Sequence, residues 1–213
     1  MQKNQNIDNN YITKQFYDLN AESFEKNTNN YLTKHLQNEA NYFLSLLSGK
    51  KILDLGCGPG RDALFFKQQG FHPICIDFSE KMISICKSKN LEAYQMDFEN
   101  LQFPKNSFDG VWAYTSLMHL PKSSMNSVLS KISLLLKPNG ILFTGMKQGN
   151  FEGFESNKNY VKDNQRFISL YLDDELKQIL QPYFKIISFE SKTIDATHTY
   201  LHVFCKKIVK IAS

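Results

Sequence analysis

Apolar and polar positions along this chain follow two different periods. Between residues 31 and 47, apolar side chains such as Leu32, Leu36 and Phe43 recur at helical spacing, which predicts a helix with one buried face. From residue 51 onward, short apolar runs alternate with helical segments, which predicts a parallel sheet with helices on both faces. The predicted strands cover residues 51–55, 71–76, 91–96, 108–114 and 141–146, and the predicted helices cover residues 62–69 and 123–136 and a segment that begins at Ser79.

The two ends of the chain depart from this alternation. Residues 1–10 are rich in Asn and Gln, which predicts disorder. We expect a helix over residues 11–17. Residues 148–166 are polar and rich in Gly and Asn, which predicts a long loop. After this loop we expect a helix over residues 173–180 and two strands, over residues 184–189 and 199–205, paired as an antiparallel hairpin at the sheet edge. No repeat or linker divides the 213 residues, so we expect one domain.

Three glycines at alternate positions follow the first predicted strand. Together with Asp54, they give the motif D-x-G-x-G-x-G from Asp54 to Gly60. Glycines at a strand-to-helix turn let the backbone pass close to a ligand, although a plain tight turn would use them too. The nicotinamide and flavin fingerprint G-x-G-x-x-G would need Gly or Ala where Arg61 stands. The Asp54 anion suits an ammonium group better than a pyrophosphate, and Arg61 could hold a carboxylate of the ligand or form a surface ion pair.

Acidic and aromatic residues stand where the next predicted strands end. In doubly wound sheets, ligands lie beyond these carboxyl ends. Asp77 could accept hydrogen bonds from both hydroxyls of a ribose, or it could cap the following helix, for which Ser79 is also available. Asp97 could accept from an adenine amino group while Phe98 packs on the ring, or it could be a simple turn residue. Met82 could cover the other face of the base or belong to the core.

Side chains able to act on a second substrate stand at and after the end of the fourth strand. His119 is the one imidazole in this position, and it could act as a base on a hydroxyl or amine or pack as a wall residue. Tyr114 carries the same alternatives. In the last strand, His198, Tyr200 and His202 share one face. They could line the substrate opening, or they could belong to a half-exposed edge strand.

Composition narrows the function classes. Hydrophobic content of 42% and charged content of 22% are ordinary for a globular protein. The net charge of +4 comes from scattered lysines and argues only weakly for nucleic acid as a partner. No apolar run approaches the roughly 20 residues of a membrane-spanning helix. The polar N-terminus lacks the apolar stretch of a signal peptide, so we expect a cytoplasmic protein that does not engage membranes.

Absent motifs exclude further chemistry. Cys57, Cys75, Cys86 and Cys205 show no C-x-x-C spacing, so we expect free buried thiols and no metal site. The sequence contains neither the phosphate-binding motif G-x-x-x-x-G-K-[ST] nor the zinc motif H-E-x-x-H. No N/D-P-P-Y/F segment follows the fourth strand, and no Pro-Cys pair supplies a nucleophile for pyrimidine chemistry.

These motifs together resemble those of the class I S-adenosylmethionine (SAM)-dependent methyltransferases, in particular of small stand-alone bacterial proteins. The resemblance rests on residues 54–60, on Asp77 and Asp97, on F-D-x-V at 108–111 and on L-K-P-x-G at 136–140. Residues 17–24 also resemble the Y-D-x-x-A-x-x-Y lid of related enzymes, with Phe24 in place of the last tyrosine. The cofactor-binding residues that we expect are Asp54, Gly56, Cys57, Gly58, Gly60, Arg61, Asp77, Phe78, Met82, Asp97, Phe98 and Ala113, and the catalytic candidates are His119 and Tyr114.

The resemblance implies a Rossmann-like, doubly wound α/β fold of seven strands with an antiparallel last strand. Residues 11–47 would form a helical lid, residues 51–146 the SAM-binding core, and residues 148–171 a loop on the acceptor side. The expected function is transfer of the SAM methyl group to a small molecule by in-line displacement, by a monomer or homodimer. The alternatives are an RNA or protein methyltransferase, a non-catalytic SAM-binding regulatory protein and, last, a dehydrogenase.

Overall fold

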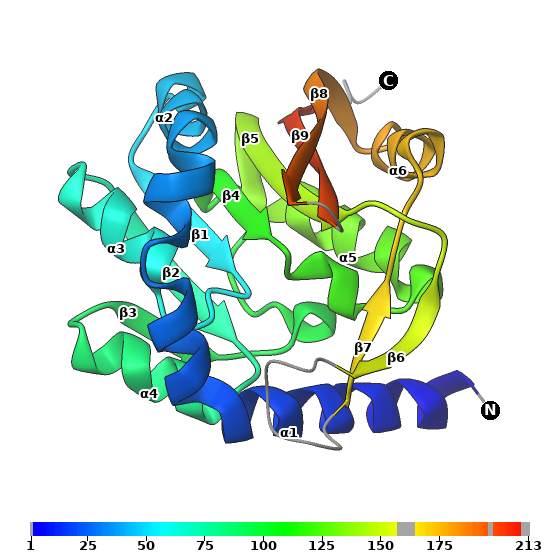
Figure 1. Cartoon of the computed structure of the whole chain (residues 1–213). Helices are drawn as coiled ribbons and strands as arrows, with labels where there is room; N and C mark the ends of the chain where they lie inside the picture. Colours follow the sequence, from blue (N-terminus) through cyan, green and yellow to red (C-terminus); the bar gives the residue numbers. More distant parts are fainter. Residues whose placement is uncertain (1, 157–164, 196–197, 210–213) are drawn as a thin grey trace.

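A seven-stranded sheet forms the centre of this computed structural model, which describes residues 2–156, 165–195 and 198–209 (Figure 1). Its strands are β1 (Lys51–Leu55), β2 (His72–Asp77), β3 (Glu92–Gln95), β4 (Phe108–Tyr114), β5 (Leu136–Lys147), β8 (Phe184–Asp195) and β9 (His198–Lys207). They lie in the order β3-β2-β1-β4-β5-β9-β8. The first five pair in parallel, and β9 runs antiparallel to both of its neighbours. The predicted α/β fold with an antiparallel last strand is confirmed.

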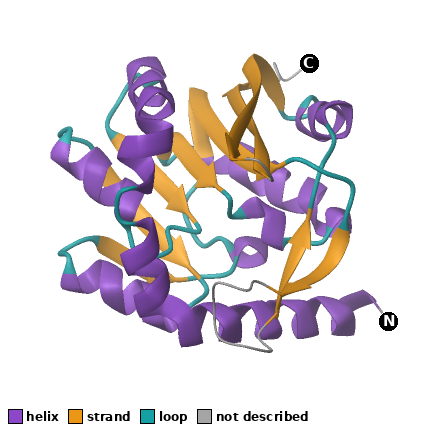
Figure 2. Ribbon diagram, viewed as in Figure 1, coloured by secondary structure: helices purple, strands orange, loops and turns teal. Residues whose placement is uncertain are grey.

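Helices cover both faces of the sheet (Figure 2). They are α2 (Gln37–Leu46), α3 (Arg61–Gln68), α4 (Glu80–Ser88), α5 (Lys122–Leu135) and α6 (Asp173–Leu180). On one face, Leu53 of β1 belongs to a buried cluster with Leu129 of α5. On the other face, Phe43 of α2 and Phe66 of α3 pack edge-on against Trp112 of β4. Successive residues of β4 face opposite sides of the sheet. Since helices cover both sides, β4 is buried along its whole length.

The helix predicted over residues 31–47 is present but starts with an irregular turn. This turn, η1 (Leu32–Leu36), has the wide hydrogen-bond spacing of a π-helix and leads directly into α2. Leu32, Leu36 and Phe43 are buried, as their spacing predicted. No helix within the described ranges is long and apolar enough to cross a membrane.

A long N-terminal helix, α1 (Gln2–Thr28), crosses the carboxyl ends of the strands (Figure 1). Asn10 donates a hydrogen bond to Oδ2 of Asp97 at 2.9 Å, and Asp18 accepts one from the Ser79 hydroxyl at 2.6 Å. The structure therefore differs from the prediction of disorder over residues 1–10 and of a helix beginning only at residue 11. The helix docks through polar contacts with strand ends that are remote in sequence, and local composition carries no sign of such contacts.

The segment predicted as a loop over residues 148–166 contains a β-hairpin instead. Strands β6 (Glu152–Ser156) and β7 (Gln165–Ser169) pair antiparallel as a separate two-stranded sheet. The rings of Phe154 and Phe167 lie edge to face with centroids 5.6 Å apart, and the backbone N–H of Phe167 donates to the Thr13 hydroxyl at 2.9 Å. Packing against α1 thus stabilises strands whose polar composition resembles a loop. Residues 157–164, in the middle of the predicted loop, lie outside the described residues.

The C-terminal strands pair as the antiparallel hairpin that was predicted at the sheet edge, but the last strand is not the edge strand. Strand β9 is an inner strand between β5 and β8, and β8 forms the edge. His202 is therefore as fully buried as Leu201 and Val203, and the half-exposed edge position predicted for this strand is wrong. Glu39 of α2 makes the burial possible, because its Oε1 accepts a hydrogen bond from Nδ1 of His202 at 3.0 Å.

Candidate active site

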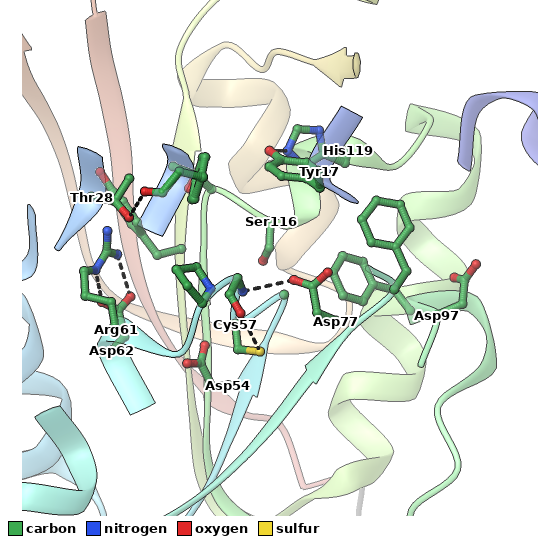
Figure 3. A pocket seen from close by; sticks show the side chains of 18 of the residues that line it. Tyr17, Thr28, Asp54, Cys57, Arg61, Asp62, Asp77, Asp97, Ser116 and His119 are labelled. Carbon is green, nitrogen blue, oxygen red and sulfur yellow. Dashed lines mark hydrogen bonds and ion pairs between the residues drawn. The ribbon is translucent and has the colours of Figure 1, made fainter. Parts of the chain in front are cut away.

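A pocket lies at the carboxyl ends of β1, β2 and β4, beneath α1. Figure 3 shows Asp54, Cys57 and Asp77 on one side of this space and Tyr17 with His119 on the other. This position is where doubly wound sheets bind their ligands. The pocket therefore gathers residues from α1, the glycine loop (residues 56–60) and the ends of three neighbouring strands.

The glycine loop needs its glycines for two reasons. The φ angles of Gly56, Gly58 and Gly60 are +75°, +51° and +77°, in the left-handed region that favours glycine. A Cβ on Gly56 would lie 2.9 Å from the Phe98 ring, whereas one on Gly58 would have 3.8 Å to the ring of Phe24. The backbone at Gly58 is thus bare on the pocket side. Gly60 faces the opposite way and does not line the pocket.

Asp77 closes β2 and stands in the pocket wall. Its Oδ2 accepts from the backbone N–H of Gly58 at 3.0 Å, and its Oδ1 accepts from that of Ser79 at 2.9 Å. The side chain of Ser79 caps α4, because its hydroxyl accepts from the Met82 N–H at 3.2 Å. Burial raises the pKa of Asp77 to about 7, although the two backbone hydrogen bonds act against this shift. The Asp77 carboxyl group therefore stays free of the cap and joins β2 to the glycine loop.

Asp54 presents an unsatisfied acceptor to the pocket. Its Oδ2 is buried and has no hydrogen-bond partner in the described structure. Burial raises the pKa of Asp54 well above its usual range, and the nearby Asp62 raises it further. Arg61 pairs with Asp62 through Nε at 2.5 Å, and Asp62 also accepts from the Trp112 indole at 2.9 Å. A buried acceptor without a partner is costly, so a cationic donor bound here would be stabilised.

Asp97 combines two of the roles that the sequence left open. Its Oδ1 accepts from the Glu99 N–H at 2.8 Å and so begins the short turn η2 (Phe98–Asn100). Its Oδ2 accepts from Asn10 at 2.9 Å. Both Asp97 and Phe98 line the pocket, as does Phe78 after β2. Asp97 is thus a turn residue and a pocket residue at once.

His119 forms a hydrogen-bonded chain with α1 and β7. Its Nδ1 lies 2.8 Å from the Phe167 carbonyl oxygen, which only accepts, so Nδ1 carries the proton. Nε2 then accepts from the Tyr17 hydroxyl at 2.7 Å, and Nη1 of Arg166 donates to the Tyr17 oxygen at 3.1 Å. Burial, together with the Arg166 charge, lowers the pKa of His119 to about 3. The imidazole is therefore neutral at neutral pH, and its tautomer is fixed.

Tyr114 lines the pocket but belongs to a different group of side chains. Its hydroxyl lies 3.0 Å from that of Tyr31, and the Arg61 guanidinium stands 5.2 Å from the centre of the Tyr31 ring. Burial raises the pKa of Tyr114 well above its usual range, and Tyr31 adds to the shift. The Tyr114 hydroxyl contacts that of Tyr31, whereas His119 contacts Tyr17 and the Phe167 carbonyl, so the two predicted catalytic residues do not form a pair in the described part of the chain.

Comparison with protein families agrees with this geometry. The family model described as a methyltransferase domain matches residues 52–140, which contain the glycine loop and the acidic strand ends. This match identifies residues 52–140 as a SAM-dependent methyltransferase domain. SAM is the methyl donor of this family.

The methyltransferase resembles known proteins over different shares of their lengths. Over 107 residues, 46% of the chain, it is 35% identical to sterol 24-C-methyltransferase ERG6B from Gibberella zeae, of which it covers 28%. Over 80% of the chain it is 25% identical to phosphoethanolamine N-methyltransferase from Plasmodium falciparum, of which it covers 69%. A crystal structure of 1,6-didemethyltoxoflavin-N1-methyltransferase from Burkholderia thailandensis, with S-adenosylhomocysteine (SAH) bound, has a TM-score of 0.63 at 17% identity, over 92% of this chain and 90% of that one. At this identity the likeness concerns the fold.

Most of the predicted site residues of the methyltransferase meet in the pocket. Gly60, Met82 and Ala113 do not line it, and Met82 and Ala113 are completely buried in the protein interior. Met82 lies in the first turn of α4, which Ser79 caps, and its side chain is buried. The predicted residues that line the pocket are Asp54, Gly56, Cys57, Gly58, Arg61, Asp77, Phe78, Asp97, Phe98, Tyr114 and His119.

Residues of α1 complete the pocket of the methyltransferase. Tyr17 and Phe24, which the lid resemblance pointed out, both line it. Asn10 and Thr28 line it as well, and sequence reasoning missed them. Neither belongs to a motif, and Asn10 falls in the segment predicted to be disordered. Only the docking of α1 brings them to the site.

Proposed function

We propose that this methyltransferase binds SAM beneath α1 and transfers its methyl group to a nucleophilic atom of a small molecule by in-line displacement. When bound, SAM supplies an electrophilic methyl group on a cationic sulfonium. Such a reaction needs little covalent help from the protein, whose task is to hold two reactants collinear in a space that excludes water. The cover that α1 forms over the pocket suits this task.

The pocket residues fit the cofactor. The unpartnered Oδ2 of Asp54 is a buried acceptor for the ammonium group, and the bare backbone at Gly58 leaves room for close approach. Each oxygen of Asp77 keeps a second lone pair with which it would accept from a ribose hydroxyl. Asp97 would accept from the adenine amino group in the same way, with Phe98 against the ring. Arg61 lines the pocket near Asp54 and would hold the carboxylate.

The observation that carries the small-molecule proposal is the contact of Tyr17 with His119. It lays α1 across the pocket, so that an acceptor has to fit between this helix and the wall formed by residues 114–120. A folded protein or a nucleic-acid duplex would have to displace the helix to reach the site. The relatives named for phosphoethanolamine and for 1,6-didemethyltoxoflavin carry small-molecule substrates in their names, which supports the same conclusion.

We assign His119 a positioning role on the acceptor side. With a pKa of about 3, the imidazole does not store a proton at neutral pH in the closed arrangement. It accepts from Tyr17 instead, and Arg166 fixes the phenol from the other side. The Tyr17 oxygen, with its proton held by His119 and one lone pair held by Arg166, then presents its remaining lone pair to the acceptor, which would align the acceptor's nucleophilic atom with the methyl group.

Two measurements test this function. Calorimetry should show that SAH binds with low micromolar affinity or better and that NAD does not bind; NAD binding tighter than SAH would refute the cofactor assignment. Methyl-tritiated SAM is then incubated with the protein and with cell extract separated into low-molecular-mass and macromolecular fractions. We expect label in small molecules only. Label confined to the macromolecular fraction would support an RNA or protein methyltransferase, and SAH binding without any transfer would support a regulatory protein.

A further inference from the structure

Three of the four cysteines meet directly beneath the glycine loop. Cys57 lies in this loop, Cys75 in β2 and Cys86 in α4, and their Sγ atoms all lie within 4.8 Å of one another. All three residues are buried. The sequence predicted free buried thiols and no metal site, because no C-x-x-C spacing is present. The fold brings the thiols together from three separate elements.

The spacing of the sulfur atoms matches a metal site better than a disulfide. The Sγ atoms of Cys57 and Cys86 are 3.7 Å apart. Two thiolates on one tetrahedral zinc ion, each bonded at about 2.3 Å, lie about 3.8 Å apart. A disulfide would instead need these atoms at about 2.05 Å, which requires a much larger displacement of the loop or of α4.

We propose that Cys57, Cys75 and Cys86 together form a binding site for a thiophilic divalent cation of the Zn²⁺ type. Soft thiolate ligands select such ions over Mg²⁺ or Ca²⁺. Apolar side chains, Ala63 and Ile83 among them, pack around the cluster. Cys57 also lines the pocket, so the fourth coordination position is open to water from that side.

The charges near the cluster are compatible with this occupant. Three thiolates and a divalent cation leave one net negative charge. The Lys89 ammonium lies at the glycine loop, where it donates to the Pro59 carbonyl oxygen at 2.8 Å. Binding converts the three thiols to thiolates and releases their protons to solvent, with no change of oxidation state. The Gly58 carbonyl, which accepts from both the Cys57 and the Cys86 thiols, loses two donors in this step.

The coordination of Zn²⁺ by the wild-type protein tests the site without any substitution. The reduced full-length chain is loaded with one equivalent of Zn²⁺ and examined by X-ray absorption. We expect three sulfur neighbours at about 2.3 Å. A coordination shell made mainly of nitrogen and oxygen, or loss of the zinc on gel filtration, would overturn the proposal.

Cysteine variants then identify the ligands. Cd²⁺ is titrated into the reduced protein, and the ultraviolet absorption of the cadmium–thiolate bonds is followed. We expect one ion per chain, with affinity at least about tenfold lower in Cys75→Ser and in Cys86→Ser; tenfold corresponds to about 1.4 kcal/mol. Cys205→Ser is the matched control, because Cys205 is also buried but lies in β9 within a different cluster. Retention of SAH binding shows that a variant folds. If Cys86→Ser does not fold, Cys86→Ala is used in its place. Equal affinity in all variants, or a loss in Cys205→Ser, would disprove the assignment.

Discussion

The phenol oxygen of Tyr17 lies 2.7 Å from Nε2 of His119, although 102 positions separate the two residues in the sequence. The contact joins α1, which covers the pocket, to the turn after β4, which forms part of the pocket wall. The position of each element therefore depends on the other. Both side chains are half-buried, and the backbone hydrogen bond at Nδ1 of His119 fixes the direction of the bond. Removal of one partner leaves the other unpaired, which costs about 1–3 kcal/mol.

His119→Ala should lower turnover and leave cofactor binding nearly unchanged. Figure 3 shows the imidazole beside Tyr17 and away from Asp54, and this is where we propose that the acceptor binds. We expect kcat to fall while SAH affinity changes by less than about threefold, under about 0.7 kcal/mol. Tyr17→Phe is the partner variant, and a double-mutant cycle should give a coupling energy of about 0.5–3 kcal/mol. Loss of SAH binding in His119→Ala would make His119 a cofactor residue and would contradict our placement of the acceptor.

The pH dependence of kcat separates positioning from general-base catalysis by His119. Burial and the Arg166 charge lower the pKa of His119 to about 3, so its protonation state does not change between pH 5.5 and 8. We therefore expect no break in log kcat near the ordinary histidine pKa of about 6.5. A break there that disappears in His119→Ala would show that the imidazole takes up the acceptor proton.

Asp77→Ala should lower the affinity for SAH by roughly 10- to 100-fold, which is the effect of losing one or two charged hydrogen bonds. The fold should persist, because the cap of α4 comes from Ser79 and not from Asp77. Ser79→Ala is the matched control: it removes the cap and a hydrogen bond to Asp18, so it should lower stability by about 1 kcal/mol or more. Calorimetry and thermal unfolding of both variants decide the matter. An unfolded Asp77→Ala protein with unchanged affinity at low temperature would assign Asp77 a structural role.

SAH affinity should rise as the pH increases from 6 to 8. Burial raises the pKa of Asp77 to about 7 in the unliganded protein, so the group is largely protonated at pH 6 and ionised at pH 8. Ribose hydroxyls donate to the carboxylate, and ligand binding therefore favours the deprotonated form. Calorimetric titrations at several pH values should show this increase, and Asp77→Asn should abolish it. A pH-independent affinity in the wild type would exclude Asp77 as the group that receives these hydroxyls.

Stability at acidic pH should depend on Glu39. Burial alone would raise its pKa, but hydrogen bonds from His202 and Lys192 outweigh this effect and lower the pKa to about 2. The ionised group therefore stabilises the protein above pH 4.5, and this contribution is lost as the pH falls from 4.5 toward 2. At pH 7, Glu39→Gln should cost about 1–3 kcal/mol in urea unfolding, the value of hydrogen bonds to charged groups. Asp174→Asn, at an exposed ion pair, should cost less than about 1 kcal/mol, and equal costs would contradict the prediction.

The sheet and its glycine loop could be predicted because their signals are local. Strand β1 runs directly into Gly56, Gly58 and Gly60, and a positive φ at each is what such a motif requires. Asp77 and Asp97 were recognisable because acids at the ends of parallel strands meet at one edge of a sheet. The orientation of the Met82 side chain was ambiguous, since a residue in the first helical turn after a strand can face either the ligand or the interior.

The parts that were missed depend on contacts between remote segments. Asn10 reaches the pocket only because α1 docks on the strand ends, and Phe167 becomes a strand residue by pairing with Phe154 and bonding to Thr13. The inner position of β9 follows from the order of the strands in the sheet and not from their hydrophobic pattern. The burial of His202 follows from this position. Polar segments of this kind have no hydrophobic period from which their structure could be read.

Residues 11–30 should become protected from hydrogen exchange when SAH binds. The expected lid function of this segment rests on polar contacts, among them Tyr17 with His119 and Asp18 with Ser79, and on few buried apolar side chains, so α1 should open locally. Since Tyr17 and Phe24 line the pocket, a bound cofactor adds contacts that only the closed helix makes. We expect slower amide exchange over residues 11–30 with SAH, measured by mass spectrometry, and faster exchange in Asp18→Ala without ligand. Lys14→Ala, which removes an exposed partner of Asp18, serves as the control and should change exchange much less. Protection confined to the glycine loop would show that α1 is a fixed part of the fold and does not move with the cofactor.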